Sequence, residues 1–345
     1  MNQPFSWPAT EAPPLGRAPA RASTEKELRL RPESGCPLLG DILLNLRRVA
    51  EARDAYRAAL ARHPDPGALQ MRLWTCAMLL GDFEEAWRIG DVLLESRGGE
   101  AVRSLPRHYQ SLWRGQPAAG RVLLVRCYHG LGDTIQFIRF AASLRRLASR
   151  LIVRTQPELL PLLAPLGTID LLLPLDGPDD PPFDVEIESM EAAHLLRLSP
   201  AALPGGVPYL FPGQEVLQTR RRQLAGHPGL KIGLVWAAGN WDGERSVPLA
   251  HFGFLAGIPG LAVINLQRGE AQAEAETVDI PWLPLPGIDP LCLQATAATL
   301  ACLDLLITVD TMAAHLAGAM GVPVWVLLKH AADWRWQHGR EDSPW

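Results

Sequence analysis

The chain has 345 residues, of which 48% are hydrophobic and 20% are charged, and its formal net charge is −4. This length predicts two or three domains, and the composition is typical of a soluble globular protein. Because the balance is acidic and there is no basic tract, nothing indicates a nucleic-acid partner or an anionic membrane surface. The longest apolar runs, such as 322–328, are too short for a transmembrane segment, and the N-terminus lacks the pattern of a secretion signal.

The cysteines occur singly, at Cys36, Cys76, Cys127, Cys292 and Cys302. Their odd number and the absence of a CxxC pair favour reduced thiols and argue against a structural zinc site. We therefore expect a cytoplasmic protein that holds no metal.

Residues 1–32 are rich in Pro, Ala, Arg and Glu and have little apolar periodicity, which predicts a disordered lead-in. The segment 33–100 carries a pattern typical of a tetratricopeptide repeat, a helix-turn-helix of 34 residues. The positions that match are Leu39, Gly40, Leu43, Ala52, Tyr56, Ala59 and Pro64.

The second copy of this repeat matches the pattern poorly. Gly90 occupies the position equivalent to Tyr56, and Trp74 occupies the position equivalent to the small Gly40. Two repeats rarely hold together alone, so we expect them to pack on the domain that follows. They are either a helical cap on that domain or a groove that binds a protein partner.

From Arg121 onward strands and helices alternate, which predicts a mostly parallel sheet covered by helices on both faces. The expected strands are 121–127, 151–155, 169–175 and 184–189, and the expected helices are 134–148, 157–165 and 190–198. We place this N-terminal Rossmann-like domain at 101–207. A Pro- and Gly-rich linker and a helix over 215–224 occupy 208–228.

A second alternation begins at Leu230 and defines a C-terminal Rossmann-like domain at 229–345. Its expected strands are 230–237, 261–267, 303–309 and 322–328, and its expected helices are 248–257, 290–301 and 311–320. Ligands bind at the carboxyl ends of the strands in such sheets, so the cleft between the two halves is the expected site.

The first candidate site is a glycine turn between strand 121–127 and the next helix. Gly130 and Gly132 allow the backbone to turn tightly and to approach a ligand. Asp133 follows in the first turn of the helix, where the macrodipole favours the ionised carboxylate. Asp133 is either a general base or an ordinary cap of the helix, and His129 is a rival general base.

The second candidate site is the turn after strand 303–309. The N–H groups around Thr311 and Met312 lie in the first turn of a helix and form a site suited to a diphosphate. Asp310 or Thr311 is expected to cap this helix. His315 either donates a hydrogen bond to a phosphate or sugar hydroxyl, or is a core histidine.

Three motifs taken together, Gly130–Phe137, Val309–Ala319 and Asp333–Trp336, resemble the tetratricopeptide-repeat glycosyltransferases. The catalytic part of that family is similar to the ADP-heptose:lipopolysaccharide heptosyltransferases. Shorter matches lie at Leu112–Gly115, Leu266–Gly269 and Arg340–Trp345, and the resemblance covers about 36–345. It implies a GT-B architecture, in which two Rossmann-like domains face each other and the C-terminal one holds a nucleotide-diphosphate-sugar donor.

The resemblance also implies roles for single residues. Asp133 falls on the proposed general base, and Thr311, Met312 and His315 fall on the donor-phosphate turn. Gln267 lies where a nucleotide base or ribose is met. Arg245 and Ser246 match an Arg-Ser pair before a helix, and Arg245 would offset the charge of the leaving group. The sequence contains no DxD motif, so we expect a metal-independent, inverting transfer without a cofactor.

The predicted function is therefore the transfer of a sugar from a nucleotide-sugar to a glycan, lipid-linked or protein acceptor. Two departures favour an alternative, a catalytically inactive interaction scaffold: the loop 239–244 is short, and the chain stops soon after strand 322–328. A nucleotide-sugar epimerase on the same plan is a third hypothesis.

The remaining candidates are predicted to be structural. Four tryptophans are expected in packing roles, namely Trp113, Trp236, Trp325 and Trp334. Glu186 and Glu188 alternate along a strand and share a face with Asp184, which we interpret as a solvated face rather than the acceptor side of the cleft.

Overall fold

The computed structural model describes residues 36–62, 66–96, 113, 115–177, 179–199, 203, 206–239, 242–285 and 292–345. The lead-in predicted at 1–32 lies outside these residues, as do parts of the predicted linker and of the Leu112–Gly115 match. Contacts divide the chain into two units. The helical unit contains Met1–Arg114, Ala193–Leu203 and His330–Trp345, and the sheet unit contains Gly115–Ala192 and Pro204–Lys329.

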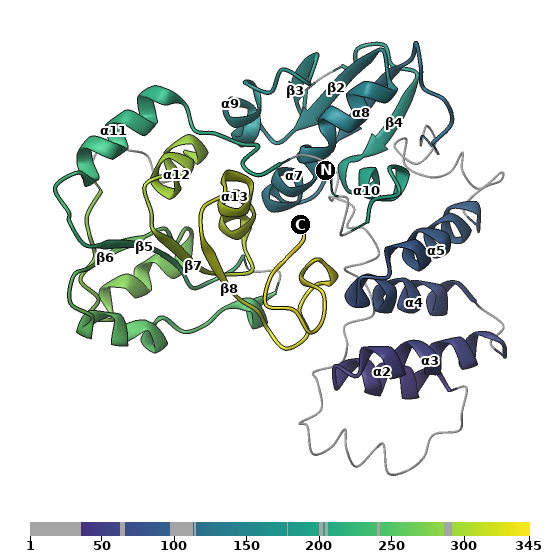
Figure 1. The fold of residues 1–345 in the computed structure, drawn as a ribbon, viewed down its shortest axis with the longest axis horizontal. Helices are drawn as coiled ribbons and strands as arrows, with labels where there is room; N and C mark the ends of the chain where they lie inside the picture. The colour runs from purple at the N-terminus through teal and green to yellow at the C-terminus, as the bar shows by residue number, and fades with distance from the viewer. Residues whose placement is uncertain are drawn as a thin grey trace. The chain divides into compact units, whose positions relative to one another are not determined.

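Four consecutive helices form the described N-terminal part of the helical unit, and each packs on the next (Figure 1). They are α2 (Pro37–Asn45), α3 (Val49–Leu60), α4 (Pro66–Leu80) and α5 (Phe83–Ser96). A proline opens α2 and another opens α4, where its missing N–H costs no helical bond. Between α4 and α5 the chain reverses at Gly81, whose φ of 73° favours glycine.

The contact between α2 and α3 depends on Gly40. A Cβ at this position would lie 2.2 Å from Cε1 of the buried Tyr56 ring, so the two helices approach this closely only because Gly40 has no side chain. The Tyr56 hydroxyl donates to Asp41 Oδ1 at 2.7 Å, and Arg72 Nε on α4 donates to the same oxygen at 2.7 Å. The close packing expected from the repeat pattern is present, while membership of the tetratricopeptide family stays a prediction.

Gly90, the position at which the second repeat departs from the first, makes room for another segment of the unit. A Cβ on Gly90 would lie 2.9 Å from Cε1 of His194. His194 Nε2 lies 3.0 Å from Asp91 Oδ1, and the Trp87 indole N–H donates to the Leu198 carbonyl at 2.7 Å. The small Gly90 thus allows residues 193–199 to pack on α5.

The segment 330–345 packs on α4 and α5, through aromatic side chains. The Trp334 ring meets the edge of Trp74 with centroids 5.5 Å apart, and Trp345 stacks on Phe83 at 5.2 Å. The His338 N–H donates to a carbonyl of α4 at 2.8 Å. The sequence pattern assigns this segment to the C-terminal Rossmann-like domain, whereas its contacts group it with the helices.

The first sheet of the sheet unit is fully parallel and has the strand order β3-β2-β1-β4. Its strands are β1 (Val122–Arg126), β2 (Arg150–Thr155), β3 (Leu171–Pro174) and β4 (Val185–Glu188), which confirms the four predicted strands. The connecting helical segments are α7 (Leu131–Phe137), η2 (Ile138–Phe140), α8 (Ala141–Leu147), η3 (Pro157–Leu159), α9 (Leu160–Leu163), η4 (Ser189–Glu191) and α10 (Ala192–Leu195).

The second sheet is also parallel and has the order β6-β5-β7-β8. Its strands are β5 (Leu230–Val235), β6 (Leu261–Asn265), β7 (Leu305–Val309) and β8 (Val324–Leu327). In Figure 1, α11 (Gln214–Leu224), α12 (Leu293–Leu300) and α13 (Met312–Met320) lie on one side of this sheet. The 3-10 helices of this half are η6 (Gly243–Arg245), η7 (Leu249–Gly257) and η8 (Glu270–Glu276). The predicted α/β class with parallel sheets is confirmed.

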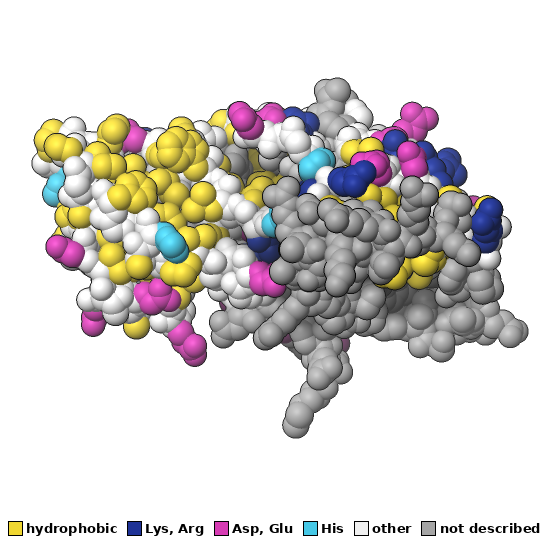
Figure 2. Space-filling model, turned by 90° about the horizontal axis from the view of Figure 1, so that it is seen from below, with side chains coloured by type: hydrophobic (Ala, Val, Ile, Leu, Met, Phe, Trp, Pro, Cys, Tyr) yellow, Lys and Arg dark blue, Asp and Glu magenta, His cyan; other side chains and the backbone are white. Residues whose placement is uncertain are grey.

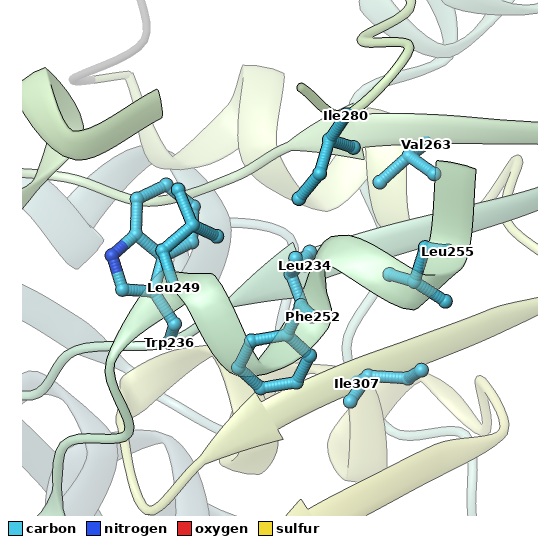
Figure 3. Packing of buried hydrophobic residues seen from close by; sticks show 8 residues of the cluster. All are labelled: Leu234, Trp236, Leu249, Phe252, Leu255, Val263, Ile280 and Ile307. Carbon is cyan, nitrogen blue, oxygen red and sulfur yellow. The ribbon is translucent and has the colours of Figure 1, made fainter. Parts of the chain in front are cut away.

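Side chains of η7 and of the second sheet form a compact apolar core, shown in Figure 3. Its buried members are Leu234, Trp236, Leu249, Phe252, Leu255, Val263, Ile280 and Ile307. Outside this core, Figure 2 shows hydrophobic side chains gathered on one face of the same half of the sheet unit. Exposed apolar residues of this half include Phe254 on η7 and Trp325 on β8.

The expectation that all four singled-out tryptophans are packing residues is wrong for one of them. Trp113, Trp236 and Trp334 are buried, whereas Trp325 is 65% exposed. The cause is its position on β8, which is the edge strand of its sheet, with a side chain that no described element covers.

The solvated face predicted for Glu186 and Glu188 is also wrong, because both side chains are buried. Glu186 and Glu188 share the predicted face of the strand, but a buried arginine of the neighbouring strand β1 pairs with Glu186 there. Arg126 Nε on β1 donates to Glu186 Oε1 at 2.7 Å, and Arg154 Nε on β2 lies 2.7 Å from Asp180 Oδ1. The ion pair with Arg126 offsets the cost of removing the Glu186 carboxylate from water.

Candidate functional site

The glycine turn joins the carboxyl end of β1 to α7, as its strand-turn-helix pattern predicts. Gly130 is the N-cap residue of α7 in an extended conformation. The backbone N–H of Gly130 donates to Asp133 Oδ2 at 2.9 Å, so the carboxylate reaches back and closes the start of the helix. The capping role given above as one of the two alternatives for Asp133 is therefore present, and the side chain remains partly exposed.

The second turn joins β7 to α13. Thr311 is the N-cap residue of this helix, but its side chain makes no capping hydrogen bond, because its Oγ1 pairs with Thr308 Oγ1 at 3.0 Å. A side-chain cap by Asp310 or Thr311 is thus not observed. The first-turn N–H groups of a helix carry the positive end of its dipole, so this start suits an anionic ligand.

The two turns meet through Gly132. A Cβ on this glycine would lie 2.7 Å from Cδ2 of the His315 ring and 3.4 Å from the Met312 Cα. The backbone of α7 therefore lies directly against the first turn of α13, within the sheet unit. His315 Nε2 also lies 4.0 Å from Asp310 Oδ1. The two sequence motifs, which are separated by about half of the chain, therefore lie side by side.

Arg245 is held at the start of α13. Its Nη1 donates to the Asp310 carbonyl at 3.0 Å, directly before the N-cap residue, and its Nε lies 3.6 Å from Asp242 Oδ2. Ser246 has a structural contact, since its Oγ accepts the Ala238 N–H at 3.0 Å. A guanidinium in this position adds positive charge to the edge of the sheet at which the helix dipole is also positive.

Lys329 is a second cation at this edge, and sequence reasoning missed it. It follows β8, and its Nζ lies 2.8 Å from the same Asp242 Oδ2 that faces Arg245. The rule that ligands bind at the carboxyl ends of strands could have found it, since Lys329 comes directly after the predicted strand 322–328.

Gln267 follows β6, and its side-chain amide is bound to backbone groups. Its Oε1 accepts the N–H groups of Trp236 and Ala237 at 3.0 and 2.9 Å. Its Nε2 donates to the carbonyls of Ala237 and Arg268 at 3.1 and 2.8 Å. The amide is thus engaged at both ends with backbone that follows β5 and β6, which fixes these loops, and its contact with a nucleotide stays a prediction.

His129 and Glu188 form a pair beside the glycine turn. His129 Nε2 lies 3.8 Å from Glu188 Oε2, and Glu188 also accepts hydrogen bonds from Ser189 Oγ and the Met190 N–H, both at 2.8 Å. Burial, aided by the charges of nearby carboxylates, raises the pKa of Glu188 to about 8. The carboxyl group is therefore mostly protonated at neutral pH. The alternation of charged residues along β4 does not predict that Glu188 is buried and protonated.

The part of the chain that the structure describes contains no group of three or more His, Cys, Asp or Glu side chains that could hold a metal ion. No helix within the described ranges is long and apolar enough to cross a membrane.

No protein-family model matches the chain. Among curated proteins, it is similar to the protein FlbA of Caulobacter vibrioides, with 27% identity over 349 residues. The match covers 88% of this chain and 55% of FlbA, so the chain spans about half the length of that relative.

Two solved glycosyltransferases resemble parts of the structure. One is a glycosyl transferase family 9 protein from Veillonella parvula, with 16% identity, a TM-score of 0.47 and coverage of 61% of this chain and 82% of that one. The other is the dodecameric iron-containing glycosyltransferase TibC of enterotoxigenic E. coli, with 15% identity, a TM-score of 0.42 and coverage of 61% and 58%. The function proposed below rests on the residues of the site.

Proposed function

We propose that the chain is a glycosyltransferase that moves a sugar from a nucleotide-diphosphate sugar to a hydroxyl of a glycan, lipid-linked or protein acceptor. The observation that carries the proposal is the contact of Gly132 with Met312 and His315, which joins the glycine turn to the start of α13. The motif resemblance supports a GT-B arrangement of the two sheets and a metal-independent, inverting reaction.

The reaction needs two kinds of group at this place. The leaving diphosphate needs positive potential, for which the first turn of α13 and Arg245 are suited. The acceptor hydroxyl must lose a proton as it attacks, and we assign this proton to Asp133, with His129 as the rival base. Asp133 projects from the first turn of α7, the same turn that brings Gly132 against α13.

The first test is calorimetric titration with UDP, ADP, GDP and CDP of the native chain and of Met312→Pro. Proline is tolerated at the first position of a helix and follows the extended Thr311 without strain, so the substitution removes one N–H and keeps α13. We expect saturable binding of one diphosphate, weakened about tenfold or more in Met312→Pro, since hydrogen bonds to charged groups contribute about 1.5–3 kcal/mol.

The matched control is Met312→Ala, which shortens the side chain and keeps the N–H; its affinity should stay close to that of the native chain. With the nucleotide known, Asp133→Asn should bind the diphosphate but lose about a hundredfold or more in sugar transfer. Failure of all four diphosphates to bind would reject the active transferase and favour an interaction scaffold. Isomerisation of the donor sugar without an acceptor would favour the epimerase.

A further inference from the structure

A carboxylate of the chain itself lies between two cations at the edge of the second sheet. Asp242 Oδ2 is 2.8 Å from Lys329 Nζ and 3.6 Å from Arg245 Nε. All three side chains are largely shielded from water, with exposed fractions of 15%, 24% and 11% for Asp242, Lys329 and Arg245. Pairs with this degree of burial interact more strongly than exposed surface pairs.

The two cations come from different parts of the sheet unit. Lys329 follows the edge strand β8, whereas Arg245 ends the short helix η6. Arg245 simultaneously donates to the Asp310 carbonyl at the start of α13. The cations therefore lie at the edge where the proposed function needs a site for the charge of a diphosphate.

The segment that carries Asp242 is short and is held by weak local bonds. Asp242 Oδ1 accepts the Glu244 N–H at 3.2 Å, and the Asp242 N–H donates to the Gly239 carbonyl at 3.5 Å. Gly243 follows directly, and a Cβ there would meet nothing within 4 Å, so packing does not fix this turn. A change in the rotamer of Asp242 would break the bond from the Glu244 N–H and the two ion pairs, while the backbone bonds of the turn, such as that from the Arg245 N–H to the Asp242 carbonyl at 3.3 Å, could remain.

We propose that Lys329 and Arg245 form the cationic part of a site for the diphosphate of a nucleotide, and that Asp242 occupies this part as an internal anion until the ligand displaces it. The inference rests on the proposed function and adds Lys329 and Asp242 to it. A diphosphate carries more charge and more acceptor oxygens than one carboxylate, so it makes stronger charge-assisted hydrogen bonds with the same two cations.

The direction in which Asp242→Asn changes the affinity for a diphosphate tests this proposal. In Asp242→Asn the competing charge is removed while the shape is kept, so we expect the affinity for the diphosphate identified above, and for inorganic pyrophosphate, to rise about tenfold. Lys329→Met should lower both affinities about tenfold. The matched control is Glu244→Gln, since Glu244 Oε2 is 3.7 Å from Lys329 Nζ but mostly exposed; its affinities should change by no more than about twofold.

Calorimetry at two salt concentrations and thermal unfolding of each variant complete the experiment. A fall in affinity in a folded Asp242→Asn would show that Asp242 positions the cations, and would overturn the inference. If Asp242→Asn is less stable, the double variant Asp242→Asn/Lys329→Met provides the test. The gain in diphosphate affinity must vanish in this variant, because the gain depends on Lys329. If the native chain binds the diphosphate, and Met312→Pro weakens this binding but Lys329→Met does not, the inference is rejected and the proposed function is kept. If neither the native chain nor any variant binds, both are rejected.

Discussion

The buried carboxyl group of Glu188 illustrates how position on a strand decides the chemistry of a side chain. Glu188 ends β4 next to His129 and near Asp133, and its environment disfavours a negative charge. At neutral pH Glu188 is therefore a hydrogen-bond partner at the glycine turn rather than a second buried negative charge beside Asp133.

The raised pKa of Glu188 predicts a pH dependence of stability. The pKa is about 4.5 in the unfolded chain and about 8 in the folded one, so between these values the folded state keeps a proton that the unfolded state releases. Rising pH from 4.5 to 8 should therefore lower the free energy of unfolding, by up to about 1.4 kcal/mol per pH unit. Glu188→Gln should remove this slope.

Urea unfolding at pH 5.0 and pH 7.5 measures the effect. The comparison is with Glu158→Gln, which changes an exposed glutamate of η3 and should keep the native slope. Equal pH dependence in the native chain and in Glu188→Gln would show that Glu188 is ionised in the folded state.

The positions of single site residues could be predicted best where a strand, a turn and a helix follow one another in the sequence. Gly132, Met312 and His315 meet because both turns lie at the carboxyl edges of parallel sheets, which the alternating pattern predicts. Glu188 and Lys329 were missed because their roles depend on which side chains of other strands surround them. That pairing is set by the strand order, about which the sequence carries no direct signal.

At the scale of helices, the contact between α7 and α13 depends on Gly132. In Gly132→Ala the new Cβ would lie 2.7 Å from the His315 ring, so one helix must shift. We expect a loss of stability of about 1–3 kcal/mol, as for other overpacked contacts, together with weaker diphosphate binding. Thermal unfolding and calorimetry measure the two effects.

The control for this substitution is Gly318→Ala in α13, where a Cβ would meet nothing within 4 Å. It should be neutral or stabilising, because alanine favours the helix. In a double-mutant cycle, His315→Ala should relieve part of the Gly132→Ala penalty. Additive losses would mean that the ring and the new methyl group do not meet.

Helix type was the least predictable property of the elements. The segment 248–257 was predicted as a helix, and η7 is a 3-10 helix over Leu249–Gly257. Apolar residues three positions apart suit both helix types, and nine residues are too few to separate a period of 3.0 from one of 3.6. The β-branched and apolar runs of the strands gave a clearer signal, and all eight predicted strands are present.

At the scale of the whole chain, the helical unit is assembled from segments that are far apart in sequence. Trp334 packs against Trp74, and Trp345 against Phe83. Trp334→Ala should therefore cost about 3–5 kcal/mol, as expected when a buried Trp is truncated. Thermal unfolding should show the loss, and proteolysis of α4 and α5 should become faster.

Trp325→Ala is the matched control, since this tryptophan is exposed on the edge strand β8. It should leave the unfolding temperature nearly unchanged. An equal effect of the two substitutions would contradict the packing of the segment 330–345 on α4 and α5.

Because the helical unit combines the first and last described segments of the chain, it cannot be completed until residues 330–345 have been synthesised. Helices α2–α5 leave the ribosome first, but the aromatic side chains that cover Trp74 and Phe83 come from residues 330–345. At ordinary rates of synthesis this delay is on the order of ten seconds or more, while both sheets are being translated. During that time Trp74 and Phe83 lack the aromatic partners that they have in the folded chain.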